Sequence, residues 1–145
     1  MHRRSLRYGW MGLLVALAGC SRGPQFAEVE GAVTRGGTPL KNVRVEFWPN
    51  SDGPKSTAVT DDNGRYVLKS EDGTTPGAVV GSHKVVVKDL SVLGNKFLGR
   101  KGENTPTLNP NAQLRFSPLY SDPARSDLTR DVTPGTKNQI DIELK

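Results

Sequence analysis

Cysteine and histidine are nearly absent from this chain of 145 residues, which contains one Cys and two His. A single cysteine excludes a disulfide bond within the chain. Zinc sites usually draw on several His or Cys side chains, and a catalytic triad needs an accessible His beside its nucleophile, whereas His83 is the only histidine beyond residue 2. The composition therefore argues against a hydrolytic or zinc-dependent enzyme. It predicts no catalytic residue, no metal ligand and no cofactor, and a structural role for His83.

The sequence also lacks an apolar run long enough to span a membrane. Its apolar run, residues 8–18, has eleven residues, whereas a membrane-spanning helix needs about 20. A positive leader with Arg3, Arg4 and Arg7 precedes this run, an order that is typical of a secretory signal peptide. We therefore expect export rather than a buried N-terminal helix, because the run has no polar face.

An excess of one charge is missing as well. The chain has 20 basic and 15 acidic side chains, and three of the basic ones, Arg3, Arg4 and Arg7, belong to the leader. The remaining 17 basic side chains exceed the acidic ones by two and are interspersed with them. No basic stripe is left for nucleic acid, so no nucleic-acid partner is expected.

What the chain does have is turn residues and alternating apolar positions. Sixteen glycines and ten prolines are spread without a repeat, which favours an all-β domain with many turns. Strands are expected where apolar and polar residues alternate or where valines run together: residues 28–35, 38–40, 42–48, 83–90, 127–132 and 138–144.

The strongest local signal lies in residues 56–68, where two β-prone runs flank Asp62, Asn63 and Gly64. Asn-Gly between alternating apolar residues predicts a β-hairpin with a type I′ turn, in which Val59 would face Leu68. A three-residue loop would shift this pairing by one. The oxygens of Asp61, Asp62 and Asn63 could in principle bind Ca²⁺, but the spacing of a calcium loop is missing, so turn chemistry is the preferred interpretation.

Residues 91–117 show no sustained period and carry a basic cluster of Lys96, Arg100 and Lys101. A long irregular loop is uncommon in a compact domain unless it is functional or disordered. Both a family-specific site and a simple insertion remain open here. Trp48 and Tyr120 are the candidate ligand contacts, because an exposed aromatic ring can stack on a sugar. The alternative for Trp48 is a structural ring covered by this loop.

Leu17-Ala18-Gly19-Cys20 resembles the lipobox of bacterial lipoproteins in all four positions. The resemblance implies cleavage before Cys20 and acylation of its sulfur, which would anchor the protein in a membrane. Ser21 in place of Asp implies sorting to the outer membrane, although the choice between inner and outer membrane stays open. We therefore expect a signal peptide over residues 1–19, a short tether over 20–27 and a single domain over 28–145.

Four blocks of the domain resemble the transthyretin-like, carboxypeptidase-regulatory-like β-sandwich: Val29-x-Gly31-x-Val33, Val43-x-Val45-x-Phe47, Thr60 to Tyr66, and Gly81-x-His83-Lys84-Val85. The resemblance implies a prealbumin-like Greek-key sandwich of about seven strands. The closing segments, Pro118-x-Tyr120-x-Asp122-Pro123 and Asn138-x-Ile140-x-Ile142-x-Leu144, resemble small envelope lipoproteins of planctomycete bacteria, most of which have no assigned activity.

The function expected from this resemblance is a non-enzymatic interaction or structural module of the cell envelope, on the periplasmic face of the outer membrane. Its partners would be the membrane, through Cys20, and an envelope protein or glycan. A carbohydrate-binding module is the alternative. The transthyretin-like hydroxyisourate hydrolases need several histidines and a C-terminal Tyr-Arg-Gly-Ser, whereas this chain ends Ile142-Glu143-Leu144-Lys145.

Overall fold

The computed structural model describes residues 23–92 and 113–145. The expected signal peptide, Cys20 and most of the expected long loop lie outside these residues. The described part is all-β, with two short 3-10 helices, η1 (Leu90–Val92) and η3 (Pro118–Ser121). None of its helices is long and apolar enough to cross a membrane.

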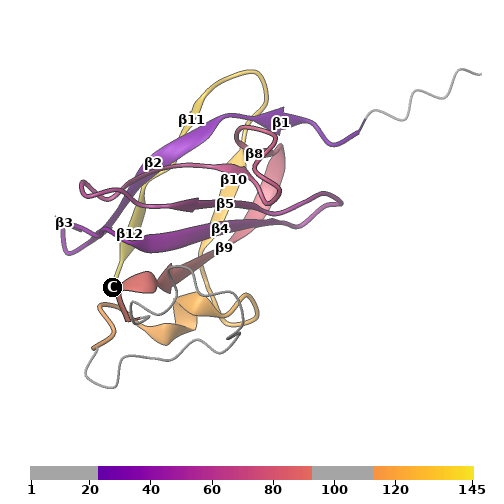
Figure 1. Cartoon of the computed structure of the whole chain (residues 1–145). Coiled ribbons are helices and arrows are strands. Elements are labelled where there is room, and N and C mark those ends of the chain that lie inside the picture. Colours follow the sequence, from indigo (N-terminus) through magenta and orange to yellow (C-terminus); the bar gives the residue numbers. More distant parts are fainter. Residues whose placement is uncertain (1–22, 93–112) are drawn as a thin grey trace, which may run out of the picture.

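Twelve strands make up the described fold, seven of three or more residues and five of only two. They form a β-sandwich (Figure 1), as the alternating pattern predicts. Their bounds are β1 (Phe26–Ala27), β2 (Val29–Arg35), β3 (Thr38–Pro39), β4 (Val43–Pro49), β5 (Ser56–Val59), β6 (Arg65–Val67), β7 (Lys69–Ser70), β8 (Ala78–Val79), β9 (Gly81–Asp89), β10 (Thr129–Val132), β11 (Asn138–Gln139) and β12 (Ile142–Leu144).

The described fold has two five-stranded sheets, and we call the one with the longer strands the larger sheet. Its strand order is β10-β9-β4-β5-β7, and all neighbouring strands in it are antiparallel. In β4 the odd positions Val43, Val45 and Phe47 are completely buried, because alternate residues of a strand share one face. The unbroken Val85-Val86-Val87 run of β9 is also completely buried. Burial of this run on both faces of the sheet is what its lack of polar residues predicts.

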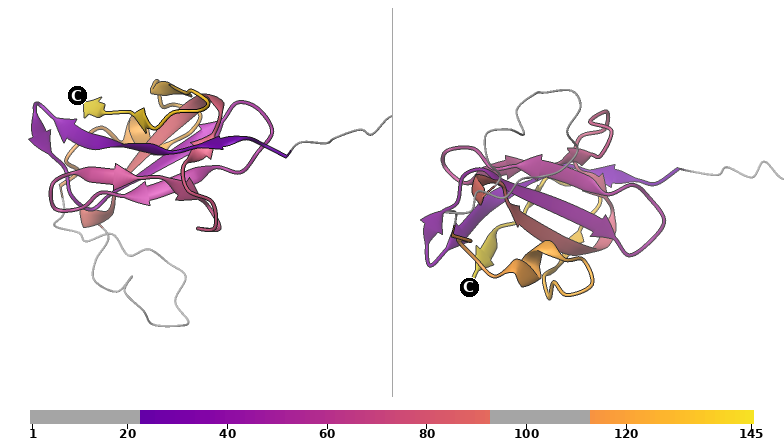
Figure 2. Two further views of the ribbon diagram at one scale, coloured as in Figure 1. Left: turned by 90° about the horizontal axis from the view of Figure 1, so that it is seen from above. Right: turned by 60° about the horizontal axis from the view of Figure 1, so that its bottom comes forward.

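The smaller sheet is built around β2. Strands β11 and β12 pair with β2 in parallel on one side, and β3 and β6 pair with it in antiparallel fashion on the other. Strand β1 pairs with β8 in a separate two-stranded ladder. In the views of Figures 1 and 2, the described N-terminal strand and the C-terminus lie at opposite ends of the sandwich.

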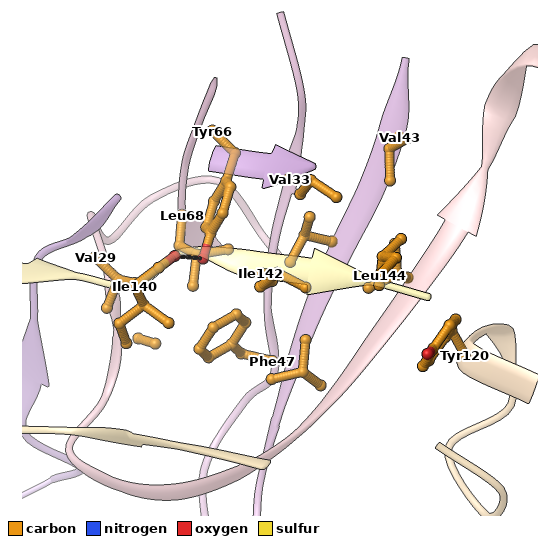
Figure 3. Packing of buried hydrophobic residues seen from close by; sticks show 14 of the residues in the cluster. Val29, Val33, Val43, Phe47, Tyr66, Leu68, Tyr120, Ile140, Ile142 and Leu144 are labelled. Carbon is orange, nitrogen blue, oxygen red and sulfur yellow. Dashed lines mark hydrogen bonds between the residues drawn. The ribbon is translucent and has the colours of Figure 1, made fainter. Parts of the chain in front are cut away.

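The core between the two sheets is filled mainly by aliphatic side chains, together with the aromatic rings of Phe47, Tyr66, Phe116 and Tyr120. Figure 3 shows part of this packing. Phe47 from the larger sheet and Tyr66 from the smaller sheet have ring centroids 6.5 Å apart. The Tyr66 hydroxyl donates to the Ile140 carbonyl over 2.6 Å. Tyr66 thus places its one polar atom on a backbone oxygen while its ring remains buried.

The segment 56–68 differs from the expected hairpin. Strand β5 pairs with β4 and β7, whereas β6 pairs with β2, so the two runs belong to different sheets. The turn itself is present, but only Gly64 has a positive φ, of 72°. Asp61 N–H donates to Arg65 C=O, which closes a three-residue loop in place of the predicted type I′ turn.

The pairing of Val59 with Leu68 is therefore wrong. Val59 lies opposite Arg44, and the Leu68 amide donates to the Val29 carbonyl. Leu68 is completely buried, whereas Val59 is 48% exposed. The physical reason is that the turn is used to cross between the two sheets, so the chain buries the second run against β2 instead of folding it back on the first.

Two expected boundaries also change. The tether expected over residues 20–27 ends inside the fold, because Phe26–Ala27 is a strand and Ala27 is buried. The strand expected over residues 138–144 is divided into β11 and β12. The division lies at Ile140 and Asp141. Here the Ile140 carbonyl accepts from the Tyr66 hydroxyl. The Asp141 carboxylate accepts from the Ala32 amide over 2.9 Å.

Candidate interaction surface

A hollow of about 540 Å³ lies on the outer side of the smaller sheet. Its walls come from β2, β6, the end of β5 and the break between β11 and β12. The residues that line it are Glu30, Gly31, Ala32, Val59, Asp61, Arg65, Tyr66, Val67, Gln139 and Asp141.

Two exposed valines form the apolar part of this hollow. Val67 is 60% exposed and Val59 is 48% exposed, and both rank among the large hydrophobic side chains that the described fold leaves in solvent. Val67 has this position because β6 alternates, with Tyr66 turned into the core between two outward residues. The sequence pattern did not reveal this patch, because the expected hairpin placed Val59 opposite Leu68 rather than beside Val67.

Among the described strands, β6 pairs only with β2, so its other edge has no strand partner. Val33 N–H donates to Gly64 C=O and Leu68 N–H donates to Val29 C=O, so the hydrogen-bonded pairs of β2 and β6 fall on every second residue. In this register the backbone N–H and C=O of Val67 point away from β2. Within residues 23–92 and 113–145, β6 pairs with no strand on this side.

Charged groups of both signs surround the two valines. Glu30 carries an ion pair with Lys137 at 2.7 Å. The Asp141 carboxylate accepts from the Ala32 amide at 2.9 Å and from the Gln139 amide side chain at 3.1 Å. Arg65 adds a positive charge. The hollow thus combines a small apolar patch with a balanced polar rim, a combination typical of transient protein contacts.

Burial raises the pKa of the Tyr66 hydroxyl far above its usual value, and the nearby Asp141 charge raises it further. The hydroxyl is therefore neutral across the physiological range, and it serves as a hydrogen-bond donor to Ile140.

Asp61, Asp62 and Asn63 serve the turn. Asp61 Oδ1 accepts from the amides of Asn63 and Arg65, each over 2.9 Å. This is the side-chain-to-backbone bonding by which Asp favours turns. The described part of the chain contains no group of three His, Cys, Asp or Glu side chains placed to hold a metal ion.

Trp48 lies on the outer face of the larger sheet, where it is half-buried. Its Nε1–H donates to Glu46 Oε2 over 3.1 Å, and Lys55 Nζ lies 4.7 Å from the centroid of the ring. Glu46 also accepts from Lys88 Nζ at 2.9 Å. Burial would raise the pKa of the Glu46 carboxyl, but the bonds from Lys88 and Trp48 outweigh it and hold the pKa below its ordinary value.

Tyr120 does not join Trp48 in one site. Its side chain is buried, and its ring centroid lies 6.4 Å from that of Phe116. Figure 3 draws it together with the other residues of the core cluster. The described structure therefore gives no support to the expected ligand contact at Tyr120, because the short helix η3 turns this ring inward. In the same helix, Leu119 is 42% exposed.

His83 is buried in the core beside Phe47, with ring centroids 5.6 Å apart. Its Nδ1 lies 2.9 Å from the Gly81 carbonyl, which is the distance of a donated hydrogen bond. Its Nε2 is buried and has no hydrogen-bond partner. Burial lowers the pKa of His83, although Gly81 and Asp131 act in the opposite direction. The neutral ring therefore has a packing role.

Sequence reasoning missed a buried ion pair at the ends of the long loop. Asp89 Oδ2 accepts from Arg115 Nε at 2.9 Å, and Asp89 Oδ1 accepts from Ser91 Oγ at 2.6 Å. The side chain of Asp89 is 1% exposed. Burial favours the neutral carboxyl, but the hydrogen bonds from Arg115 and Ser91 prevail and lower its pKa. The one available signal was an acidic residue at an inward position of β9.

Comparison of the chain with protein-family models, with curated proteins and with solved structures gave no match.

Proposed function

We propose that this chain is a lipid-anchored protein of the bacterial cell envelope whose β-sandwich acts as a non-enzymatic interaction module. Cys20 carries the anchor, and the module faces the periplasm from the outer membrane. The partner is another envelope protein, which docks in the hollow beside β6. The lipobox at residues 17–20 supports the anchor, and the surface of the smaller sheet supports the module.

The observation that carries the docking site is the pair Val59 and Val67 next to the open edge of β6. An extended segment of a partner could bond to the outward N–H and C=O of Val67, as in strand addition at a sheet edge. Its apolar side chains would cover the two valines. Because only one residue of the edge is open, contacts of this kind are few, and binding should be weak and reversible.

The location of His83 supports a non-enzymatic role. A general base must reach the proton that it abstracts, whereas the His83 ring is buried between the sheets and one nitrogen is used on the Gly81 carbonyl.

Photo-crosslinking in cells tests the docking site. A photoreactive amino acid at Val67 of the full-length lipidated protein should give one recurrent protein adduct, and the same group at the exposed residue Thr136 should not. Val59→Lys should abolish the adduct while the melting temperature stays close to that of the wild type, because Val59 is already half exposed.

The same experiment can reject this site. Adducts formed equally at Val67 and Thr136 would show random encounters. Adducts formed only from Leu119, which is exposed next to the described end of the long loop, would move the docking site to residues 91–117.

Glycan binding at Trp48 is the second candidate, and Tyr120 no longer contributes to it. Trp48 has the hydrogen-bonding groups of Glu46 and Lys88 beside it, as many sugar sites do, but Lys55 lies over its ring. Retention on cell-wall polysaccharide should fall for Trp48→Ala if this surface binds glycans. Unchanged retention would remove the main support for this function.

A further inference from the structure

The chain between the expected acylation site at Cys20 and the folded domain is short, because backbone hydrogen bonds to the domain begin at Gln25. The Val80 amide donates to the Gln25 carbonyl over 2.8 Å, and Phe26 and Ala27 pair with Val79 and Ala78. Strand β1 is therefore part of the domain, and the chain has a fixed path from Gln25 onward.

This early attachment limits how far the domain can move from an anchored Cys20. Five Cα-to-Cα steps separate Cys20 from Gln25, and a fully extended chain covers at most about 18 Å in that distance. The limit holds for any conformation of the intervening residues. Gln25 therefore stays within about 18 Å of the lipid headgroups if Cys20 carries acyl chains.

Two loops surround the entry of the chain. A Cβ on Gly53, in the loop between β4 and β5, would meet Val79 and Pro24. The loop between β10 and β11 forms a second hollow with β1, lined by Phe26 together with Gly135, Thr136 and Lys137. We call this end of the molecule the entry end.

The opposite end of the sandwich lies one strand length away. Strand β2 runs from Val29, next to β1, to Arg35, a length of about 20 Å. Arg35 pairs with Leu144, so Lys145 lies at this far end. Figures 1 and 2 show the C-terminus on the side of the molecule opposite strand β1.

We propose that the entry end, formed by β1, residues 50–54 and residues 133–137, rests against the lipid headgroups, and that the far end points into the periplasm. This orientation rests on the lipid anchor of the proposed function. It leaves the hollow beside β6 on a flank of the domain that an envelope partner can reach.

The loops of the entry end carry no net charge, so the proposed orientation should not depend on whether the lipid is anionic or zwitterionic. The loops of the entry end carry Asp52 and Lys137, one charge of each sign. The competing arrangement has the domain lying on its larger sheet, where Arg44 and Lys69 are exposed on the outer face. That arrangement would need anionic lipid, because cationic side chains are attracted to anionic headgroups.

Fluorescence quenching on vesicles tests the orientation with the full lipidated chain. Acylation of the only cysteine leaves no other thiol, so Ser51→Cys and Lys145→Cys can each carry a single dye. Vesicles of zwitterionic lipid with a quencher on the headgroup should reduce the fluorescence at position 51 much more than at position 145. Thr136→Cys repeats the measurement at a second entry-end position and should behave like Ser51→Cys.

Equal quenching at positions 51 and 145, or stronger quenching at 145, would overturn the orientation. Quenching at position 145 that appears only with anionic lipid would show instead that the domain lies on its larger sheet. Flotation of the vesicles is measured first, with Cys20→Ala as the control. If the protein with an intact Cys20 does not float with the vesicles, the lipid anchor is absent. In that case the proposed function fails together with the orientation.

Discussion

Gly31 occupies a position of β2 where a side chain has no room. A Cβ at this site would lie 1.8 Å from the Ile140 carbonyl oxygen and 3.1 Å from the Tyr66 ring. The glycine lets the Tyr66 ring cross β2 and donate its hydroxyl to Ile140. Its place between Val29 and Val33 was visible in the sequence, whereas the reason for it was not.

We expect Gly31→Ala to lower the free energy of unfolding by about 3 kcal/mol, because the backbone of Ile140 must move to admit a methyl group. Gly37→Ala is the matched control. Its site is open but has a φ of 75°, so only the conformational cost of about 1 kcal/mol applies. Urea denaturation measures both, and similar losses for the two variants would contradict the close approach.

The buried His83 predicts a pH dependence of stability. In the unfolded chain a histidine has a pKa of about 6.5, and burial lowers the pKa of His83 in the folded state. The unfolded chain therefore binds more protons at mildly acidic pH, and stability rises with pH in this range. The part of the stability that depends on a neutral His83 is fully present above about pH 6.5. It is lost as the pH falls toward the folded-state pKa of His83.

Unfolding free energies measured from pH 7 to pH 5 should therefore decrease for the wild type, and His83→Phe should remove most of this slope. Asp131→Asn should steepen the decrease, because the Asp131 carboxylate favours the protonated imidazole. A slope that survives in His83→Phe would assign the pH dependence to other groups.

At the scale of the elements, one carboxylate joins the end of β9 to the segment before η3. Asp89 accepts from Ser91 and from the backbone and side chain of Arg115, and Phe116 next to it is buried. The loop expected over residues 91–117 is therefore fixed at both of its described ends.

We expect Asp89→Asn to destabilise the domain by about 2–3 kcal/mol, because removal of one partner from a buried ion pair leaves the other without compensation. The side chain of Arg115 is 28% exposed, so water relieves part of this cost. Asp62→Asn is the control, since the Lys41–Asp62 pair spans 3.5 Å in solvent and should contribute less than about 0.5 kcal/mol. Thermal or urea unfolding would reject the role of Asp89 if the two variants lost equal stability.

At the scale of the whole molecule, the domain begins before the boundary that the sequence indicates. A chain that starts at Glu28 lacks β1 and its pairing with β8, whereas one that starts at Gly23 retains both. We expect the shorter chain to be less stable by about 2 kcal/mol, from the loss of about two backbone hydrogen bonds and of the partly buried Phe26 side chain.

A chain that starts at Gln25 provides the control and should match the one that starts at Gly23, because the Val80 amide still finds the Gln25 carbonyl. Equal stability of the chains starting at Glu28 and Gly23 would show that β1 does not stabilise the domain and belongs to the tether. That result would also lengthen the free chain between Cys20 and the domain and weaken the proposed orientation at the membrane.

The sequence alone determined the all-β class and the buried positions of its clearest strands, including Val43, Val45, Phe47 and the Val85–Val87 run. These follow from alternation, which is a local property of the chain. Only the tertiary structure decided that β5 and β6 join different sheets and that Tyr120 is buried. It also decided that Asp89 meets Arg115. Such outcomes depend on contacts between residues far apart in the chain, and no local pattern encodes them.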